Sequence, residues 1–86
     1  MQQPVELLLY SKEDCPLCED MAAAAAEAAR HVPLTVTYVD ITADPRLQSE
    51  YGLDIPLLFH DGTCIAKHRI TAEELVARLK RRLGLR

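Results

Sequence analysis

The chain has 86 residues, of which 49% are hydrophobic and 27% are charged. These proportions are typical of one folded domain over residues 1–86 and argue against a disordered or low-complexity chain. No apolar run is long enough to span a bilayer, and the start of the chain lacks the basic segment of a secretory signal. We therefore expect a cytoplasmic protein with no membrane partner.

The charged residues are unevenly distributed along the chain. The formal net charge of −3 argues against general nucleic-acid binding. Residues 77–86 nevertheless hold five basic side chains and no acidic one. Basic side chains complement the negative end of a helix dipole, so we expect them to support a final helix rather than bind RNA or anionic lipid.

The first half of the chain predicts a strand, a helix and a second strand. Residues 5–10 form a short apolar run of the length of a buried strand. From Pro16 to about His31 the sequence is rich in alanine, the best helix former. Residues 34–39 are rich in β-branched side chains and predict the second strand.

The second half predicts a helix, a hairpin and a last helix. Asp44 and Pro45 start a short helix that ends near Tyr51. The strands at 55–60 and 63–67 flank an Asp-Gly pair, which is a strong signal for a hairpin turn. The segment 71–74 has the Thr-x-x-Glu pattern of a capping box and precedes a helix to about residue 83.

This order, β-α-β-α-β-β-α, indicates an α/β fold. The β-α-β unit favours parallel pairing of its two strands, and the hairpin adds antiparallel pairing. We expect a four-stranded mixed sheet with three helices in a three-layer sandwich.

Cys15-Pro16-Leu17-Cys18 is the motif most suited to chemistry. Proline at the first helical position makes Cys15 the N-cap and places Cys18 in the first turn. A thiolate at Cys15 would face unpaired backbone N–H groups and the positive end of the helix dipole. In the Cys-x-x-Cys motif such surroundings lower the thiol pKa. We therefore predict that Cys15 is the exposed nucleophile and that Cys18, more buried, resolves a mixed disulfide.

The segment Tyr10–Cys18 resembles the glutaredoxin active-site pattern Tyr-Ser-Lys-x-x-Cys-Pro-Tyr-Cys. Ile55 and Pro56 resemble the Val-Pro of thioredoxin-fold proteins, in which the proline is cis and faces the cysteines. The resemblance implies a thioredoxin-like fold and a thiol–disulfide oxidoreductase without a bound cofactor. It also implies that Lys12 stabilises the thiolate, and that Ile55 and Pro56 shape the substrate groove. The closest resemblance is to small bacterial glutaredoxin-like proteins with a Cys-x-Leu-Cys motif.

The chain also departs from the glutaredoxin pattern. Ala66 and Lys67 stand where glutaredoxins have Gly-Gly, a pair that holds the glutamyl end of glutathione in that family. Four carboxylates surround the cysteine motif and oppose both thiolate formation and an anionic tripeptide. Glutathione therefore stays a candidate reductant, but its binding site is in question. We expect the protein to be a monomer whose partner is a disulfide-containing protein or a small thiol. The four carboxylates belong to Glu13, Asp14, Glu19 and Asp20.

Two other interpretations of the cysteine motif stay open. Cys15 and Cys18 are two ligands of a zinc site if Cys64, His60 or His68 supplies the others, although the hairpin strand lacks the usual knuckle geometry. A thioredoxin-fold module used only for binding is the second alternative. Cys64 itself has the character of a small strand residue.

Overall fold

The structure is a computed structural model that describes residues 3–85. The description does not include Met1, Gln2 and Arg86. The two ends of the predicted domain, residues 1–86, and the last basic residue of the chain therefore lie outside the described residues. Within this described part, no helix has the length and apolar character needed to cross a membrane.

The element order matches the order predicted from the sequence. The sheet has the strand order β2-β1-β3-β4; β1 pairs in parallel with β2, and the other two pairs are antiparallel. This mixed sheet with three helices confirms the predicted α/β, thioredoxin-like fold. The elements are β1 (Val5–Ser11), α1 (Pro16–Ala28), β2 (Leu34–Asp40), a 3₁₀ turn (Ile41–Ala43), α2 (Pro45–Tyr51), β3 (Leu57–His60), β4 (Thr63–Lys67) and α3 (Ala72–Leu83).

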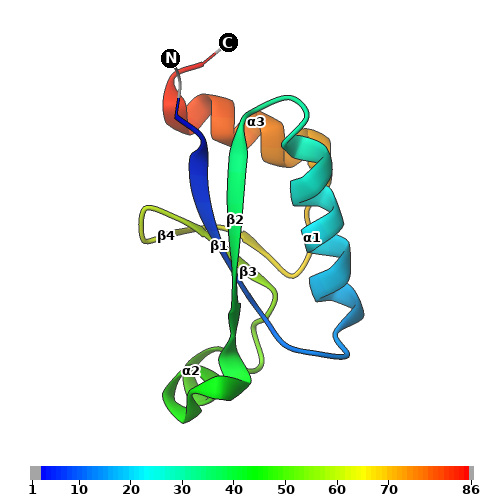
Figure 1. Cartoon of the computed structure of the whole chain (residues 1–86), viewed down its shortest axis with the longest axis vertical. Coiled ribbons are helices and arrows are strands. Elements are labelled where there is room, and N and C mark those ends of the chain that lie inside the picture. The colour runs from blue at the N-terminus through cyan, green and yellow to red at the C-terminus, as the bar shows by residue number, and fades with distance from the viewer. Residues whose placement is uncertain (1–2, 86) are drawn as a thin grey trace.

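The main core lies between one face of the sheet and the helices α1 and α3, which lie on the same side of it (Figure 1). Helix α1 contributes mostly small side chains, and α3 contributes large ones. The short side chains allow a close approach of α1 to the sheet, as its alanine-rich sequence predicts. Fully buried core residues include Leu7 and Leu9 of β1, Met21, Ala25 and Ala28 of α1, Leu58 of β3, and Leu75 and Leu79 of α3.

The second face of the sheet is covered at one end only. Helix α2 lies at the end of the molecule where β2 finishes (Figure 1), and its Tyr51 packs against Tyr10 and Phe59. Leu8, although it belongs to an inner strand, keeps 40% of its surface exposed. The predicted third layer is therefore present, but it is small.

Several predicted boundaries were wrong. Helix α1 ends at Ala28 instead of near His31, because residues 29–32 form turns that return the chain to the sheet ahead of Pro33. Strand β3 begins at Leu57 rather than at residue 55, because Pro56 has no backbone N–H to donate to a neighbouring strand and the pairing with β1 starts at Leu57. The bond between Ile55 and Pro56 is cis. The 3₁₀ turn after β2 was not predicted.

Helix α3 has the ends that the sequence predicts. Thr71 Oγ1 accepts the backbone N–H of Glu74 at 3.0 Å, and the Glu74 carboxylate accepts the N–H of Thr71 at 3.2 Å. Basic side chains occupy its last turn, and Gly84 ends it in the left-handed conformation with φ 69°. Both hydrogen bonds satisfy N–H groups that a helix start otherwise leaves unpaired.

Candidate active site

The first turn of α1 presents the cysteine pair. Cys15 is the N-cap in an extended conformation, with Pro16 as the first helical residue. The Cys15 sulfur accepts the backbone N–H of Cys18 at 3.2 Å, so a sulfur atom takes the place of the usual hydroxyl or carboxylate cap. Cys18 is 4% exposed and Cys15 is half-buried. The difference in burial is in the predicted direction.

In this structure Cys15 and Cys18 form a disulfide, with their Cα atoms 5.2 Å apart. Cys64, the third cysteine, is free and exposed on β4. The pair is therefore close enough to alternate between a dithiol and a disulfide within one helical turn.

A small second core lies behind the cysteines. Cys18 is buried together with Ile41 and Ile55, and Cys15 packs against the same cluster. The Tyr10 ring lies 5.2 Å from that of Tyr51, in an edge-to-face arrangement. Partial burial, followed by the negative charge of Glu50, raises the pKa of the Tyr51 phenol, so the phenol stays neutral beside the cysteines.

The cis proline stands next to this cluster, as the resemblance implies. The carbonyl of Pro56 accepts the backbone N–H of His68 at 2.9 Å, which holds the turn after β4 against the proline. Ile55, the preceding residue, packs with Cys18. Within residues 3–85, neither the N–H nor the C=O of Ile55 has a hydrogen-bond partner. A segment laid beside it would therefore find one donor and one acceptor.

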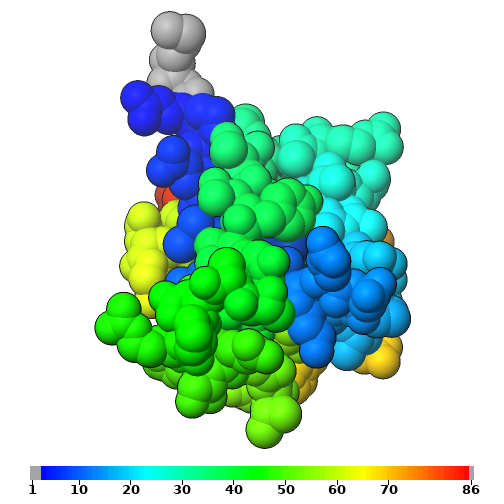
Figure 2. Space-filling view, turned by 60° about the horizontal axis from the view of Figure 1, so that its bottom comes forward, coloured from blue at the N-terminus to red at the C-terminus, as the bar shows by residue number. Residues whose placement is uncertain are grey.

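Charged side chains surround the cysteine motif on the exposed surface. The carboxylate groups of Glu13, Asp14, Glu19 and Asp20 all belong to exposed residues, and Lys12 is exposed with them. In the described part of the chain Lys12 makes no ion pair or hydrogen bond, so its charge is available to the site. Figure 2 brings this end of the molecule forward and shows the loop before α1 (blue) beside the segment that contains α2 (green).

The zinc alternative finds no set of ligands in the structure. No group of three or more His, Cys, Asp or Glu side chains within residues 3–85 is placed to hold a metal ion. His60, one of the candidates, is 9% exposed and its Nδ1 accepts a hydrogen bond from Arg82 Nε at 2.9 Å. That nitrogen is therefore committed to another partner.

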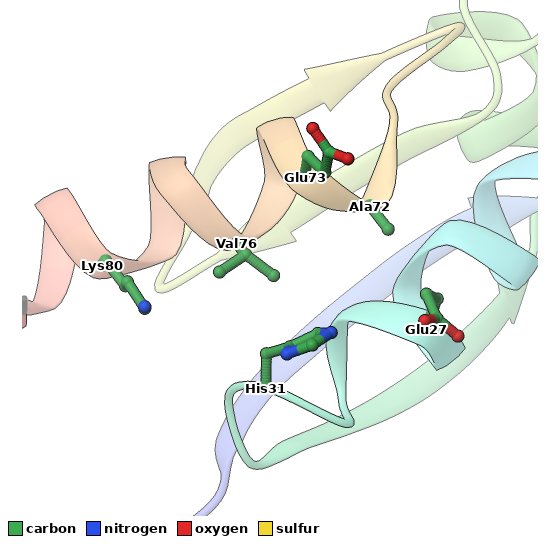
Figure 3. A pocket seen from close by; sticks show the side chains of 6 residues that line it. All are labelled: Glu27, His31, Ala72, Glu73, Val76 and Lys80. Atoms are coloured by element: carbon green, nitrogen blue, oxygen red, sulfur yellow. The ribbon is translucent and has the colours of Figure 1, made fainter.

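A separate hollow of about 400 Å³ lies between the end of α1 and helix α3. Figure 3 shows Val76 of α3 pointing across it toward His31, which follows α1. Of its two acidic residues, Glu27 and Glu73, the first already pairs with Arg30 at 3.4 Å. None of the residues that line it belongs to the cysteine motif or to the cis-proline turn, so the hollow has no part in the cysteine site.

Residues 6–80 match the family model described as glutaredoxin-like domain (DUF836). The chain belongs to this glutaredoxin-like family. Among solved structures, protein XcR50 of X. campestris is 33% identical and has a TM-score of 0.77, over 87% of this chain and 96% of that one. Protein Ne2328 of Nitrosomonas europaea is 22% identical with a TM-score of 0.76, over 90% and 93% of the two chains. No curated protein matches the sequence.

A more distant likeness extends to thioredoxins. Thioredoxin 1 of Thermosipho africanus has a TM-score of 0.64 at 13% identity, over 92% of this chain and 94% of that one. At that identity the likeness shows the fold alone. The shared fold agrees with the strand order β2-β1-β3-β4 of this chain.

The structure brings together four of the five predicted site residues: Cys15, Cys18, Ile55 and Pro56. Lys12 lies in the same loop but points to no partner among the described residues. The residues that sequence reasoning missed are apolar and lie behind the cysteines. On α2, Leu47 and Tyr51 are four residues apart and therefore lie on one helix face, a spacing that could have indicated a second core.

Proposed function

We propose that this glutaredoxin-like protein is a cytoplasmic thiol–disulfide oxidoreductase that acts through Cys15 and Cys18. The observation that carries the proposal is the Cys15 sulfur at the N-cap of α1, where it accepts the N–H of Cys18 at 3.2 Å. The same N–H, together with the helix dipole, favours a thiolate at Cys15 once the disulfide is reduced. Lys12 adds a positive charge in the same loop.

The reaction consists of two exchanges. The Cys15 thiolate attacks one sulfur of a substrate disulfide, and the other substrate sulfur leaves as a thiolate that takes up a proton. Cys18 then loses its proton and attacks the Cys15 sulfur, which releases the second substrate thiol and forms the Cys15–Cys18 disulfide. Two electrons pass from the protein to the substrate. Glutathione or a second dithiol protein returns the pair to the reduced state.

The neighbourhood of Pro56 supports a groove for an extended substrate segment. Ile55 has an unpaired N–H and C=O in the described structure, next to the buried Cys18. These groups would pair with the backbone of a segment that carries the target disulfide. Ile55 and Pro56 therefore position the substrate, and the two cysteines react with it.

The charges around the motif favour a protein substrate with basic residues near its disulfide. Four exposed carboxylates flank the cysteines on the α1 side, against the single charge of Lys12. Opposite charges raise the rate of encounter, and like charges lower it. An anionic tripeptide such as glutathione would meet these carboxylates, so glutathione is the less favoured substrate.

The test compares three single variants in a coupled disulfide-reduction assay that contains both glutathione and thioredoxin reducing systems. Wild type and Cys64→Ser should be active, whereas Cys15→Ser should fall to the background rate. Cys18→Ser should lose turnover with dithiol recycling and accumulate a mixed disulfide at Cys15, seen as a reductant-sensitive mass increase. A wild type as inert as Cys15→Ser would refute the enzyme and favour a module used only for binding.

A further inference from the structure

Three arginines of α3 line a hollow beside the β3–β4 hairpin. The hollow has a volume of about 330 Å³, and none of the residues that line it belongs to the cysteine motif. In Figure 1 the last turns of α3 (red) lie at the opposite end of the molecule from α2. The residues that line the hollow are Thr63, Cys64, Ile65, Arg78, Arg81 and Arg82.

The thiol of Cys64 does not open into this hollow. Cys64 pairs with Phe59, which pairs with Leu8 on the face of the sheet that α3 does not cover. Because paired residues share a face, the Cys64 sulfur lies on the side opposite to α3. Thr63 pairs with His60, whose side chain contacts α3, and therefore faces the helix. The chemistry of the hollow is therefore that of its guanidinium groups.

Two of the arginines are fixed in place by hydrogen bonds to neutral groups. Arg78 Nη1 donates to the carbonyl of Ile65 at 2.6 Å. Arg82 Nε donates to Nδ1 of the buried His60 at 2.9 Å, and its Nη2 lies 3.5 Å from the His60 carbonyl oxygen. A guanidinium group has five N–H donors, so each of these two keeps donors for a further partner.

The positive charge of the three arginines is not neutralised by ion pairs. Among residues 3–85, no carboxylate lies within ion-pair distance of Arg78, Arg81 or Arg82. Glu74, one turn before Arg78, caps the start of the helix, and Asp61 faces the neighbouring imidazole at 3.5 Å. The positions i, i+3 and i+4 place three like charges on one face of α3, an arrangement that is unfavourable unless an anion joins it.

The dipole of α3 explains the sign of these charges but not their arrangement. Its negative end attracts positive charge to the last turn, whichever side of the helix carries that charge. Lys80, in the same turn, lines the other hollow between α1 and α3. The three arginines instead lie together on the hairpin side, and two of them are tied to it. Such a group of oriented donors without a counter-ion is suited to an anionic ligand.

A phosphate group matches the three guanidinium groups better than a carboxylate does. A phosphate monoester carries a charge of about −1.5 to −2 at neutral pH and has three strong acceptor oxygens. A carboxylate carries one charge and has two oxygens. Arginine binds either group through two parallel hydrogen bonds, but only the phosphate has an oxygen for each of three arginines. The net charge of −3 argues against a nucleic acid as the source of the phosphate.

We propose that this arginine hollow binds a phosphate dianion, either free or as the terminal group of a small phosphate monoester. Arg78 and Arg82 keep their bonds to the hairpin and donate their remaining N–H groups to the phosphate oxygens. Arg81, which is exposed and has no hydrogen bond among the described residues, turns its side chain onto the third oxygen. No bond is made or broken in the ligand.

The proposal goes beyond the oxidoreductase function and does not rest on it. None of the three arginines belongs to the cysteine site, which has an acidic rim. The hollow should therefore bind phosphate equally well whether Cys15 and Cys18 are a disulfide or a dithiol. A protein without reductase activity that still binds phosphate would refute the first proposal and leave this one intact.

The test is a titration of the isotope-labelled full chain with inorganic phosphate, followed by the amide NMR signals. Sodium chloride keeps the ionic strength constant, and sodium acetate is the monovalent comparison. Phosphate should shift the signals of Thr63, Ile65 and Arg81 to saturation, with a dissociation constant about tenfold lower than that of acetate. Shifts that never saturate, equal affinity for acetate, or shifts confined to the Cys15 loop would each overturn the proposal.

Arg81 provides the matched variants, because it is exposed and its side chain does not hold the hairpin. Arg81→Gln keeps a similar helix propensity and should weaken phosphate binding about tenfold. Arg81→Glu should abolish binding. Arg46→Gln, at an exposed arginine of α2, should leave the dissociation constant unchanged. Phosphate binding that survives Arg81→Glu, or that Arg46→Gln weakens equally, would show that the hollow is not the site.

Two further ligands identify the source of the phosphate. Methyl phosphate that binds as tightly as inorganic phosphate would assign the hollow to small phosphate monoesters, and a loss of about tenfold would assign it to free phosphate. A short single-stranded oligonucleotide should bind no more tightly than methyl phosphate at the same ionic strength. Much tighter binding of the oligonucleotide, with signal shifts that extend beyond the hollow, would mean a nucleic-acid surface and contradict the proposal.

Discussion

Helices α1 and α3 lie side by side on one face of the sheet, but their first turns are built for different purposes. Helix α3 starts with a reciprocal pair of hydrogen bonds between Thr71 and Glu74. Helix α1 starts with a sulfur acceptor, Cys15, which takes only the N–H of Cys18. Oxygen accepts hydrogen bonds better than sulfur does, so α1 has the weaker cap and keeps at that position an atom that reacts.

The buried faces of the two helices also differ, in the size of the side chains that they place in the core. Helix α3 fills the core with Leu75 and Leu79, whereas α1 buries Ala25, Ala28 and Met21. Large aliphatic side chains remove more apolar surface from water than alanines do. The comparison indicates that α3 supplies more of the folding free energy, and that the start of α1 is positioned by the structure around it.

The largest expected effect is on the core face of α3. Leu79→Ala should lower the free energy of unfolding by about 2–5 kcal/mol, because Leu79 is fully buried and its loss leaves a cavity. Urea unfolding followed by circular dichroism measures the change. Ala77→Gly, on the exposed side of the same helix, is the control and should cost about 1 kcal/mol through helix propensity alone. A Leu79→Ala loss no greater than that of the control would reverse the comparison.

Local signals in the sequence account for most of the fold. Each helix start was marked by a proline or a capping box, and the hairpin by Asp61-Gly62, because these residues restrict their own backbone. The end of α1 was misplaced, since alanine favours helix wherever it stands and the turn after Ala28 depends on packing. Only the likeness of Ile55-Pro56 to thioredoxin-fold proteins indicated the cis bond.

The site was predictable to a smaller extent than the fold. The cysteines and Pro56 were found because their spacing and neighbours form a pattern along the chain. Tyr51 and the link between Arg82 and His60 were missed, because those contacts join residues that are far apart in sequence. The positive charge of the last helix was evident from the sequence, but the hydrogen bonds that its arginines make were not. The prediction assigned it to the helix dipole alone, whereas two of its arginines also bind the hairpin.

A smaller effect is expected from exchanging the caps themselves. Thr71→Ala should lower the free energy of unfolding by about 1 kcal/mol, because the N–H of Glu74 loses its acceptor. Cys15→Ser should cost nothing relative to the reduced wild type, since a serine hydroxyl is a good N-cap. Urea unfolding in the presence of a reductant compares the three proteins. If Cys15→Ser destabilises the fold as much as Thr71→Ala does, the sulfur is a stronger cap than a hydroxyl oxygen, and α1 does not have the weaker cap.

The smallest expected effect concerns the acid stability of α3. Hydrogen bonds from the Thr71 side chain and backbone lower the pKa of Glu74 below its usual value. The folded state therefore binds the proton less tightly than the unfolded state, and the stabilisation is complete above the ordinary glutamate pKa of about 4.3. It is lost as the pH falls below that value and through the lower pKa of the folded state.

Glu74→Gln tests this expectation, because glutamine still accepts the N–H of Thr71 but carries no charge. The wild type should be the more stable of the two at neutral pH, and the difference in urea midpoint should shrink as the pH drops from 5 toward 3. Asp40, whose pKa is lowered by its hydrogen bonds with Thr42, titrates in both proteins and cancels in the difference. Glu73→Gln, in the same turn but without a hydrogen bond to Thr71, should show a weaker pH dependence. A difference that is constant with pH would mean that the carboxylate charge contributes nothing to this cap, and that α3 differs from α1 only through the oxygen acceptor.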